Sequence, residues 1–336
     1  MSCFYRRTSK YHNTLQNDET GRTPLHNACI NHAALSVIQQ ILNTDNYIRA
    51  KDSFGETPLH YACQFGASFS IVSLLLETCP EAVKDVGRYG WTPLHVAIRN
   101  KTASLEVIQL LMEKWPEAMR VEDENGCCPL HLACRNRASV DVVRLLVERC
   151  EEGVCRENHN GTLLHHACSK KAPSEVVALL LQKYPQAVKQ KDNFGETPLH
   201  VACRNKAPIE VLSLLLEHWP QAVQQPSLMD ITPHDIILQR KNIPPSIVWL
   251  ITSVYYLFDS GEVEIPTAKG AMDCFISIEW SFGIRLVLDL CPSVTQVMEM
   301  NDLYMPYFLG MVGRRCKMLT LWNMLLNMQD LLNTAQ

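Results

Sequence analysis

The feature that most constrains this chain is an internal repeat with a period of about 35 residues. The tetrapeptide Thr-Pro-Leu-His begins at Thr23, Thr57, Thr92 and Thr197. Near copies begin at Cys128 and Thr162, and a decayed copy, Thr-Pro-His-Asp, begins at Thr232. Successive copies are offset by 34, 35, 36, 34, 35 and 35 residues. A fixed period of this length predicts a stack of similar units, each of which contacts only its neighbours.

The residues of one unit predict two short amphipathic helices. Leu94, Ala97 and Ile98 are spaced as i, i+3 and i+4, and the apolar cluster at 107–111 has the same helical spacing. The proline after each threonine fits the first turn of a helix that a hydroxyl group caps. The fold class is therefore all-α.

The loop between units has a constant length. Thirteen residues separate the proline that closes one unit from the proline that opens the next, for example Pro80 from Pro93. A glycine, for which positive φ is cheap, recurs in this loop, and the fifth unit has asparagine there. These turn residues are Gly55, Gly90, Gly126, Asn160 and Gly195.

The motif, period and loop resemble those of the ankyrin-repeat family over residues 20 to about 258. The units gain residues at the end of the second helix, as in 77–82 and 113–118, and this long-period variant resembles ankyrin-repeat proteins of diatoms and related algae. The resemblance implies a solenoid of helix-turn-helix units whose motif histidines hydrogen-bond within and between loops. The residues assigned to this structural motif are Thr57, Pro58, Leu59, His60, Thr92, Pro93, Leu94, His95, Thr197, Pro198, Leu199 and His200.

The repeat spacing predicts the organisation of the whole chain. We expect a polar N-terminal segment at 1–19, a first repeat at 20–53 that caps the stack, repeats at 54–88, 89–124, 125–158, 159–193 and 194–229, and a decayed repeat at 230–258. Pro292 and Pro306 keep nearly the same spacing, so 259–336 is interpreted as degenerate helical repeats that form a C-terminal cap. The alternative is an adaptor in which 259–336 is a separate module that recruits an effector.

Charge and composition exclude several classes of protein. Thirty-one Lys and Arg against 35 Asp and Glu give a net charge of -4, which disfavours nucleic acid as a partner and a polybasic membrane anchor. The longest apolar stretch, 247–258, is too short to span a membrane, and the N-terminus does not resemble a secretory signal. Fourteen cysteines without such a signal favour a reducing compartment with free thiols, cytoplasmic or nuclear.

No motif in the sequence predicts catalysis or a cofactor. Five His-x-x-Cys pairs recur, the first at His26 and Cys29, but they follow the repeat rather than the four convergent ligands of a zinc site. The phosphate-loop, dinucleotide, nucleophile-elbow and zinc-protease motifs are missing from the sequence. We therefore expect no enzyme activity, no metal and no cofactor.

Two sets of residues are candidates for binding a protein partner. The first is a ladder of cations after the first helix of each unit: Arg99, Lys101, Arg135, Arg137, Lys170, Lys171, Arg204 and Lys206. The second is the set of aromatics beside the turn glycines: Phe54, Tyr89, Trp91 and Phe194.

Each set has a structural alternative. The cations suit the negative end of a helix, with Asn100, Asn136 and Asn205 as left-handed caps, and the aromatics could pack on the neighbouring turn. The resemblance implies that partners bind the first-helix face and the turns. The expected function is thus a non-catalytic scaffold, a monomer that binds an unidentified protein through an acidic or phosphorylated segment.

Overall fold

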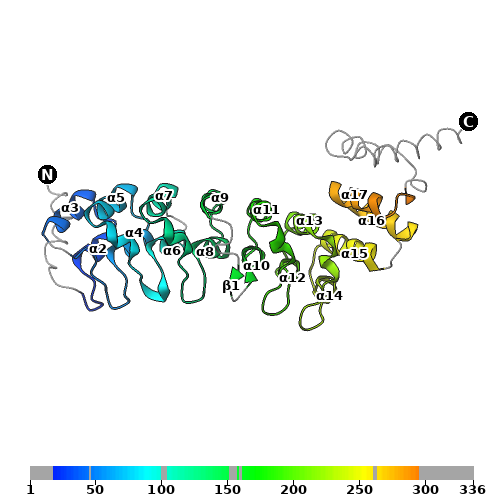
Figure 1. Ribbon diagram of the computed structural model, residues 1–336, viewed down its shortest axis with the longest axis horizontal. Helices are drawn as coiled ribbons and strands as arrows, with labels where there is room; N and C mark the ends of the chain where they lie inside the picture. The colour runs from blue at the N-terminus through cyan, green and yellow to red at the C-terminus, as the bar shows by residue number, and fades with distance from the viewer. Residues whose placement is uncertain are drawn as a thin grey trace, which may run out of the picture. The chain divides into compact units, whose positions relative to one another are not determined.

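The structure is a computed structural model that describes residues 18–44, 47–99, 104–150, 157–158, 161–259 and 263–294. Helices dominate the described residues, which confirms the all-α class (Figure 1). The chain divides into two compact units, Met1–Lys183 and Tyr184–Gln336, and each is described separately.

The first unit is built from helix pairs. One row of helices, here called the inner row, comprises α2 (Pro24–Ile30), α4 (Pro58–Gln64), α6 (Pro93–Arg99), α8 (Pro129–Asn136) and α10 (Leu163–Ser169). The outer row comprises α3 (Leu35–Thr44), α5 (Phe69–Thr78), α7 (Leu105–Lys114), α9 (Val140–Arg149) and α11 (Ser174–Lys183). Each helix packs against its pair and against the next helix in its row (Figure 1). The stack predicted from the period is therefore present.

Short elements join these pairs. Three 3-10 helices follow or precede the turns, namely η1 (Pro80–Lys84), η2 (Arg88–Gly90) and η3 (Pro116–Arg120). The loop before α10 contains an antiparallel pair of two-residue strands, β1 (Glu157–Asn158) and β2 (Gly161–Thr162).

The second unit begins with the same pattern of helix pairs and departs from this pattern toward its end. It contains η4 (Pro185–Lys189), α12 (Pro198–Arg204), α13 (Ile209–His218), η5 (Pro220–Gln224), α14 (Pro233–Gln239), α15 (Pro245–Asp259), α16 (Ile265–Ser277) and α17 (Ser281–Leu290). Helix α16 packs against both α15 and α17. Cys291, which ends α17, has the backbone conformation of Trp219, which ends α13 (φ -138° and -155°). The proposed end of the cap near Pro306 lies outside the described residues.

The motif histidine fixes each loop to its helix. The backbone N–H of Thr57 donates to Nδ1 of His60 (3.2 Å), so the proton of the neutral ring is on Nε2, which donates to the carbonyl of Trp91 (3.1 Å). The same two bonds form at His26, His95 and His200. These bonds join successive loops, as the resemblance implied.

Small side chains let the inner helices approach closely. Ala62, Ala97 and Ala133 are fully buried, and Cys63 and Cys134, which follow two of these alanines, are buried as well. Burial raises the pKa of the Cys29 thiol to about 12, so this thiol stays protonated. The expectation that all cysteines are free is wrong at Cys128, which is disulfide-bonded.

The expected left-handed caps lie one residue further along the chain. Asn205 has φ -90° and Asn136 is still helical, whereas Arg137, Lys171 and Lys206 have φ between 53° and 56°. The inner helix therefore runs on before the chain reverses, and the amide of Asn205 donates back to the Val201 carbonyl (2.8 Å). Asn100 and Asn160 lie outside the described residues.

Candidate functional site

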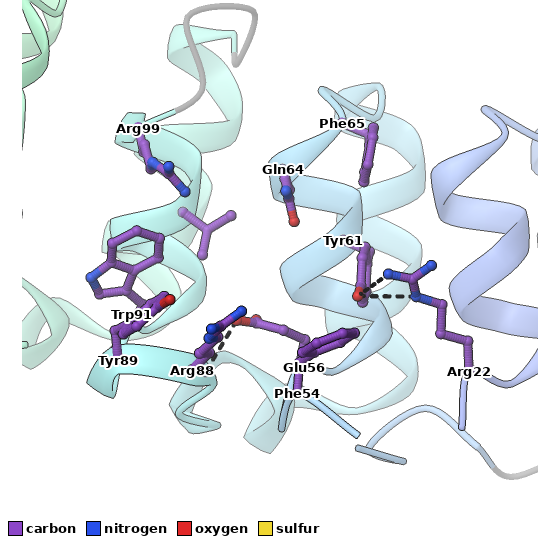
Figure 2. Close-up of a pocket in the computed structure, with 11 residues that line it drawn as sticks. Arg22, Phe54, Glu56, Tyr61, Gln64, Phe65, Arg88, Tyr89, Trp91 and Arg99 are labelled. Carbon is purple, nitrogen blue, oxygen red and sulfur yellow. Dashed lines mark hydrogen bonds between the residues drawn. The ribbon is translucent and has the colours of Figure 1, made fainter. Parts of the chain in front are cut away.

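The first unit carries a groove of about 500 Å³ along its inner helices and turns (Figure 2). Four of its residues were predicted as partner contacts: Phe54, Tyr89, Trp91 and Arg99. Seven were not: Arg22, Glu56, Tyr61, Gln64, Phe65, Arg88 and Val96. Equivalent positions of successive repeats line the groove, since Arg22, Glu56 and Trp91 each precede a motif threonine.

All three arginines of the groove lie over aromatic rings. The guanidinium of Arg88 is 4.5 Å from the ring centre of Tyr89 and 5.7 Å from that of Phe54. The guanidinium of Arg99 is 4.7 Å from the ring centre of Trp91. Stacking of this kind stabilises the side chain through the ring quadrupole and uses the flat face of the guanidinium.

The guanidinium of Arg22 is 4.9 Å from the ring centre of Tyr61 and 6.0 Å from that of Phe54, and it is hydrogen-bonded as well. Its Nε and Nη2 donate to the Tyr61 hydroxyl (3.1 and 2.8 Å), which donates to a carboxylate oxygen of Asp52 (2.7 Å). Asp52 is buried and also lies 3.6 Å from Arg22 Nε. The charge of Arg22 is therefore balanced inside the protein, at one end of the groove.

Glu56 is the acidic member of the lining. Its side chain is 13% exposed, and its Oε1 accepts from the backbone N–H of Arg88 (3.1 Å). Its Oε2 is buried and has no hydrogen-bond partner among the described residues. Burial raises the pKa of this carboxyl group.

The aromatic residues at the turns divide into two kinds. Trp91 is half-buried and its indole N–H donates to Asp123 (3.1 Å), so it packs on the next loop as the structural alternative proposed. Phe54 and Tyr89 are 43% and 42% exposed. Phe194, at the equivalent turn of the second unit, is 64% exposed. The exposed rings are the ones available to a partner.

The cations of the predicted ladder have different surroundings in the structure. Arg135, Arg137, Lys170 and Lys171 are exposed in the first unit but do not line the groove. In the second unit, both terminal nitrogens of Arg204 donate to the carboxylate of Glu196, and Lys206 donates to the carbonyls of Lys241 and Asn242. Lys101 lies outside the described residues.

One position explains why these arginines differ. The residue eight positions before each arginine is its neighbour across the motif: Trp91 for Arg99 and Glu196 for Arg204. A tryptophan leaves the N–H groups of the guanidinium available, whereas a glutamate consumes them. The sequence contains this pairing, but only the fold shows that the two positions meet.

Among the described residues, no group of three or more His, Cys, Asp and Glu side chains is placed to hold a metal ion. In the same residues, no helix is both long and apolar enough to cross a membrane.

Comparisons with known proteins agree with this architecture. A family model described as ankyrin repeats (3 copies) matches residues 7–85, 30–119, 68–154, 101–189 and 150–227. No curated protein matches the chain. Among solved structures, the chain is similar to the crystal structure of the human ASB11 ankyrin repeat domain, with 23% identity, a TM-score of 0.52, and coverage of 64% of this chain and 90% of that one. The chain therefore belongs to the ankyrin-repeat family, whose members are generally non-catalytic and whose repeats are generally protein–protein interaction modules.

Proposed function

We propose that this protein is a non-catalytic scaffold that binds a partner protein through the groove of its first unit. The observation that carries the proposal is the meeting of exposed aromatic rings and stacked arginines in one hollow. Aromatic residues and arginine are enriched among the residues that supply most of the binding energy in protein interfaces, because they bury large areas and can form directed polar contacts.

The shape of the groove supports an extended segment of the partner as its ligand. The groove follows the inner helices across three repeats, from Arg22 to Arg99, and its ends differ in chemistry. All three arginines lie over rings, but only Arg22 is paired with a described carboxylate, that of Asp52. An acidic or phosphorylated segment would complement this distribution of charge.

Photocrosslinking from single positions of the full-length chain tests the proposal. A benzophenone amino acid replaces Phe54 or Tyr89 in the groove, and Phe69 on the outer helix α5 serves as the control. Phe69 is matched in residue type and exposure, being 46% exposed. We expect the two groove positions to capture one common partner in cells and the control to capture little of it.

A common partner captured equally from Phe69 would contradict the groove as the binding surface. Capture from the control alone would assign binding to the outer helices instead.

A further inference from the structure

We propose that the groove recognises a phosphorylated side chain of the partner, with Arg88 and Arg99 as the residues that bind the phosphate. This inference rests on the proposed function and specifies the chemistry of the ligand. Both arginines are exposed and both line the same groove, as Figure 2 shows.

The way each guanidinium is held favours an oxyanion as its ligand. The ring of Tyr89 or Trp91 covers one face of the guanidinium and restricts its orientation. The N–H groups lie in the plane of the guanidinium and point away from its edge, so stacking leaves them free to donate. Neither arginine forms an ion pair with a described carboxylate. Two oriented sets of donors are therefore available in one groove.

The cations of the groove outnumber its carboxyl groups, as an anionic ligand requires. Three arginines line it, but the charge of Arg22 is offset by Asp52. Glu56 is the only acidic residue among the described lining residues, and burial raises the pKa of its carboxyl group. Arg88 and Arg99 thus place two guanidinium groups beside a single carboxyl group, and a phosphorylated residue carries about -1.5 to -2 at neutral pH for them to bind.

The other cations of the described chain lack this combination. Arg204 is committed to Glu196, and Lys206 donates to backbone carbonyls. Arg135 and Lys170 are exposed, but no described aromatic ring lies under them. A cation without such support keeps its side-chain freedom and loses more entropy when it binds.

Selection from peptide libraries with the full-length protein tests the inference. The libraries have degenerate flanks around a fixed central phosphotyrosine, phosphoserine or phosphothreonine, and matched libraries carry the unphosphorylated residue or glutamate. We expect at least one phosphorylated library to be retained about tenfold or more over its unphosphorylated match, because two charge-assisted contacts are gained. Equal retention of the phosphorylated and unphosphorylated libraries would overturn the inference. Equal retention of the glutamate library would assign the groove to an acidic segment and overturn phosphate recognition.

Variants then assign the contact to the two arginines. Arg88→Gln/Arg99→Gln should weaken binding of a selected phosphopeptide by about tenfold or more, while Arg88→Lys/Arg99→Lys should show an intermediate loss, because lysine keeps the charge but not the planar donors. The control Arg135→Gln/Lys170→Gln removes the same charge outside the groove and should bind within about twofold of wild type. Equal loss in the control would contradict the assignment.

Because the photocrosslinking test needs no phosphate, groove capture without phosphopeptide selection would refute only this inference.

Discussion

The histidine of each Thr-Pro-Leu-His motif has a structural role that depends on a neutral ring. Its Nδ1 accepts one backbone bond and its Nε2 donates another, an arrangement that only the neutral form permits. Burial lowers the pKa of His60, His95 and His200 to about 4. The repeat therefore couples the joining of its loops to the protonation state of one residue.

This coupling predicts that stability falls as the solution becomes mildly acidic. The unfolded chain has ordinary histidine pKa values of about 6.5, so between about pH 6.5 and pH 4 it binds more protons than the folded chain. The histidine contribution is fully present above about pH 6.5 and is lost as the pH falls toward the folded pKa. Urea titrations should give a clearly lower midpoint at pH 5 than at pH 7.5. An unchanged midpoint would show that these histidines do not need to be neutral.

The pair of Arg204 and Glu196 predicts unequal costs for two similar substitutions. Glu196 is 4% exposed, and Arg204→Gln would remove the guanidinium that balances its charge. We expect a loss of about 1–3 kcal/mol in the free energy of unfolding. Arg135→Gln, at the equivalent exposed position, should change it by less than about 0.5 kcal/mol. Chemical denaturation of both variants measures the difference, and equal values would contradict the pairing.

For single residues, the sequence predicts the location of a side chain better than it predicts the side chains that contact it. Arg99, Phe54 and Tyr89 are recognisable because each varies at a fixed place in a regular repeat. Arg22 was missed, because its role depends on Tyr61, which is 39 residues away and meets it only across stacked helices. Arg88 was missed because the ladder was sought only at the ends of the inner helices.

At the scale of elements, the turns act as linked units. Backbone hydrogen bonds join several described neighbouring turns, such as Leu228 N–H to the Phe194 carbonyl (3.0 Å) and Glu124 N–H to the Tyr89 carbonyl (3.0 Å). Between the turns at 52–57 and 87–92, the backbone N–H of Arg88 donates to the Glu56 carboxylate instead (3.1 Å). These bonds hold the exposed turn aromatics in register along the repeats. The backbone conformation of each turn therefore has to allow close approach of the neighbouring turn.

Two turn glycines test this requirement. Both Gly55 and Gly195 have positive φ, so alanine at either position would be strained by about 1–2 kcal/mol. An added Cβ at Gly195 would lie 2.8 Å from the backbone nitrogen of Leu228, whereas nothing lies within 4 Å of one at Gly55. We expect Gly195→Ala to destabilise the protein by at least about 1 kcal/mol more than Gly55→Ala. Urea denaturation gives both values, and similar losses would argue against close contact between the turns.

The sequence predicted the beginnings of the helices better than their ends. Threonine followed by proline gives a cap and a preset first turn, so the start of α4 at Pro58 and of α12 at Pro198 follows directly. The end of an inner helix has no comparable signal. Asparagine was expected to take the left-handed conformation, but the stack places Lys206 there instead. The 3-10 helix after each closing proline was not anticipated either.

At the scale of the whole molecule, the repeat determines the class of function and leaves the partner open. The family match extends over residues 7–227. The motif residues are buried and engaged with one another, so they are common to the framework. We propose that the identity of the partner is encoded in the exposed rings and in arginines such as Arg88 and Arg99, whose neighbours only the folded chain reveals.

Hydrogen exchange of the full-length chain, free and bound to the partner captured from the groove, tests the central claim most directly. Binding in the groove predicts slower exchange in the turns at 52–57 and 87–92 and at the adjoining ends of α4 and α6. The outer helices α5 and α7 should exchange as they do in the free protein. Slowed exchange confined to those outer helices, or to residues 263–294, would contradict the account.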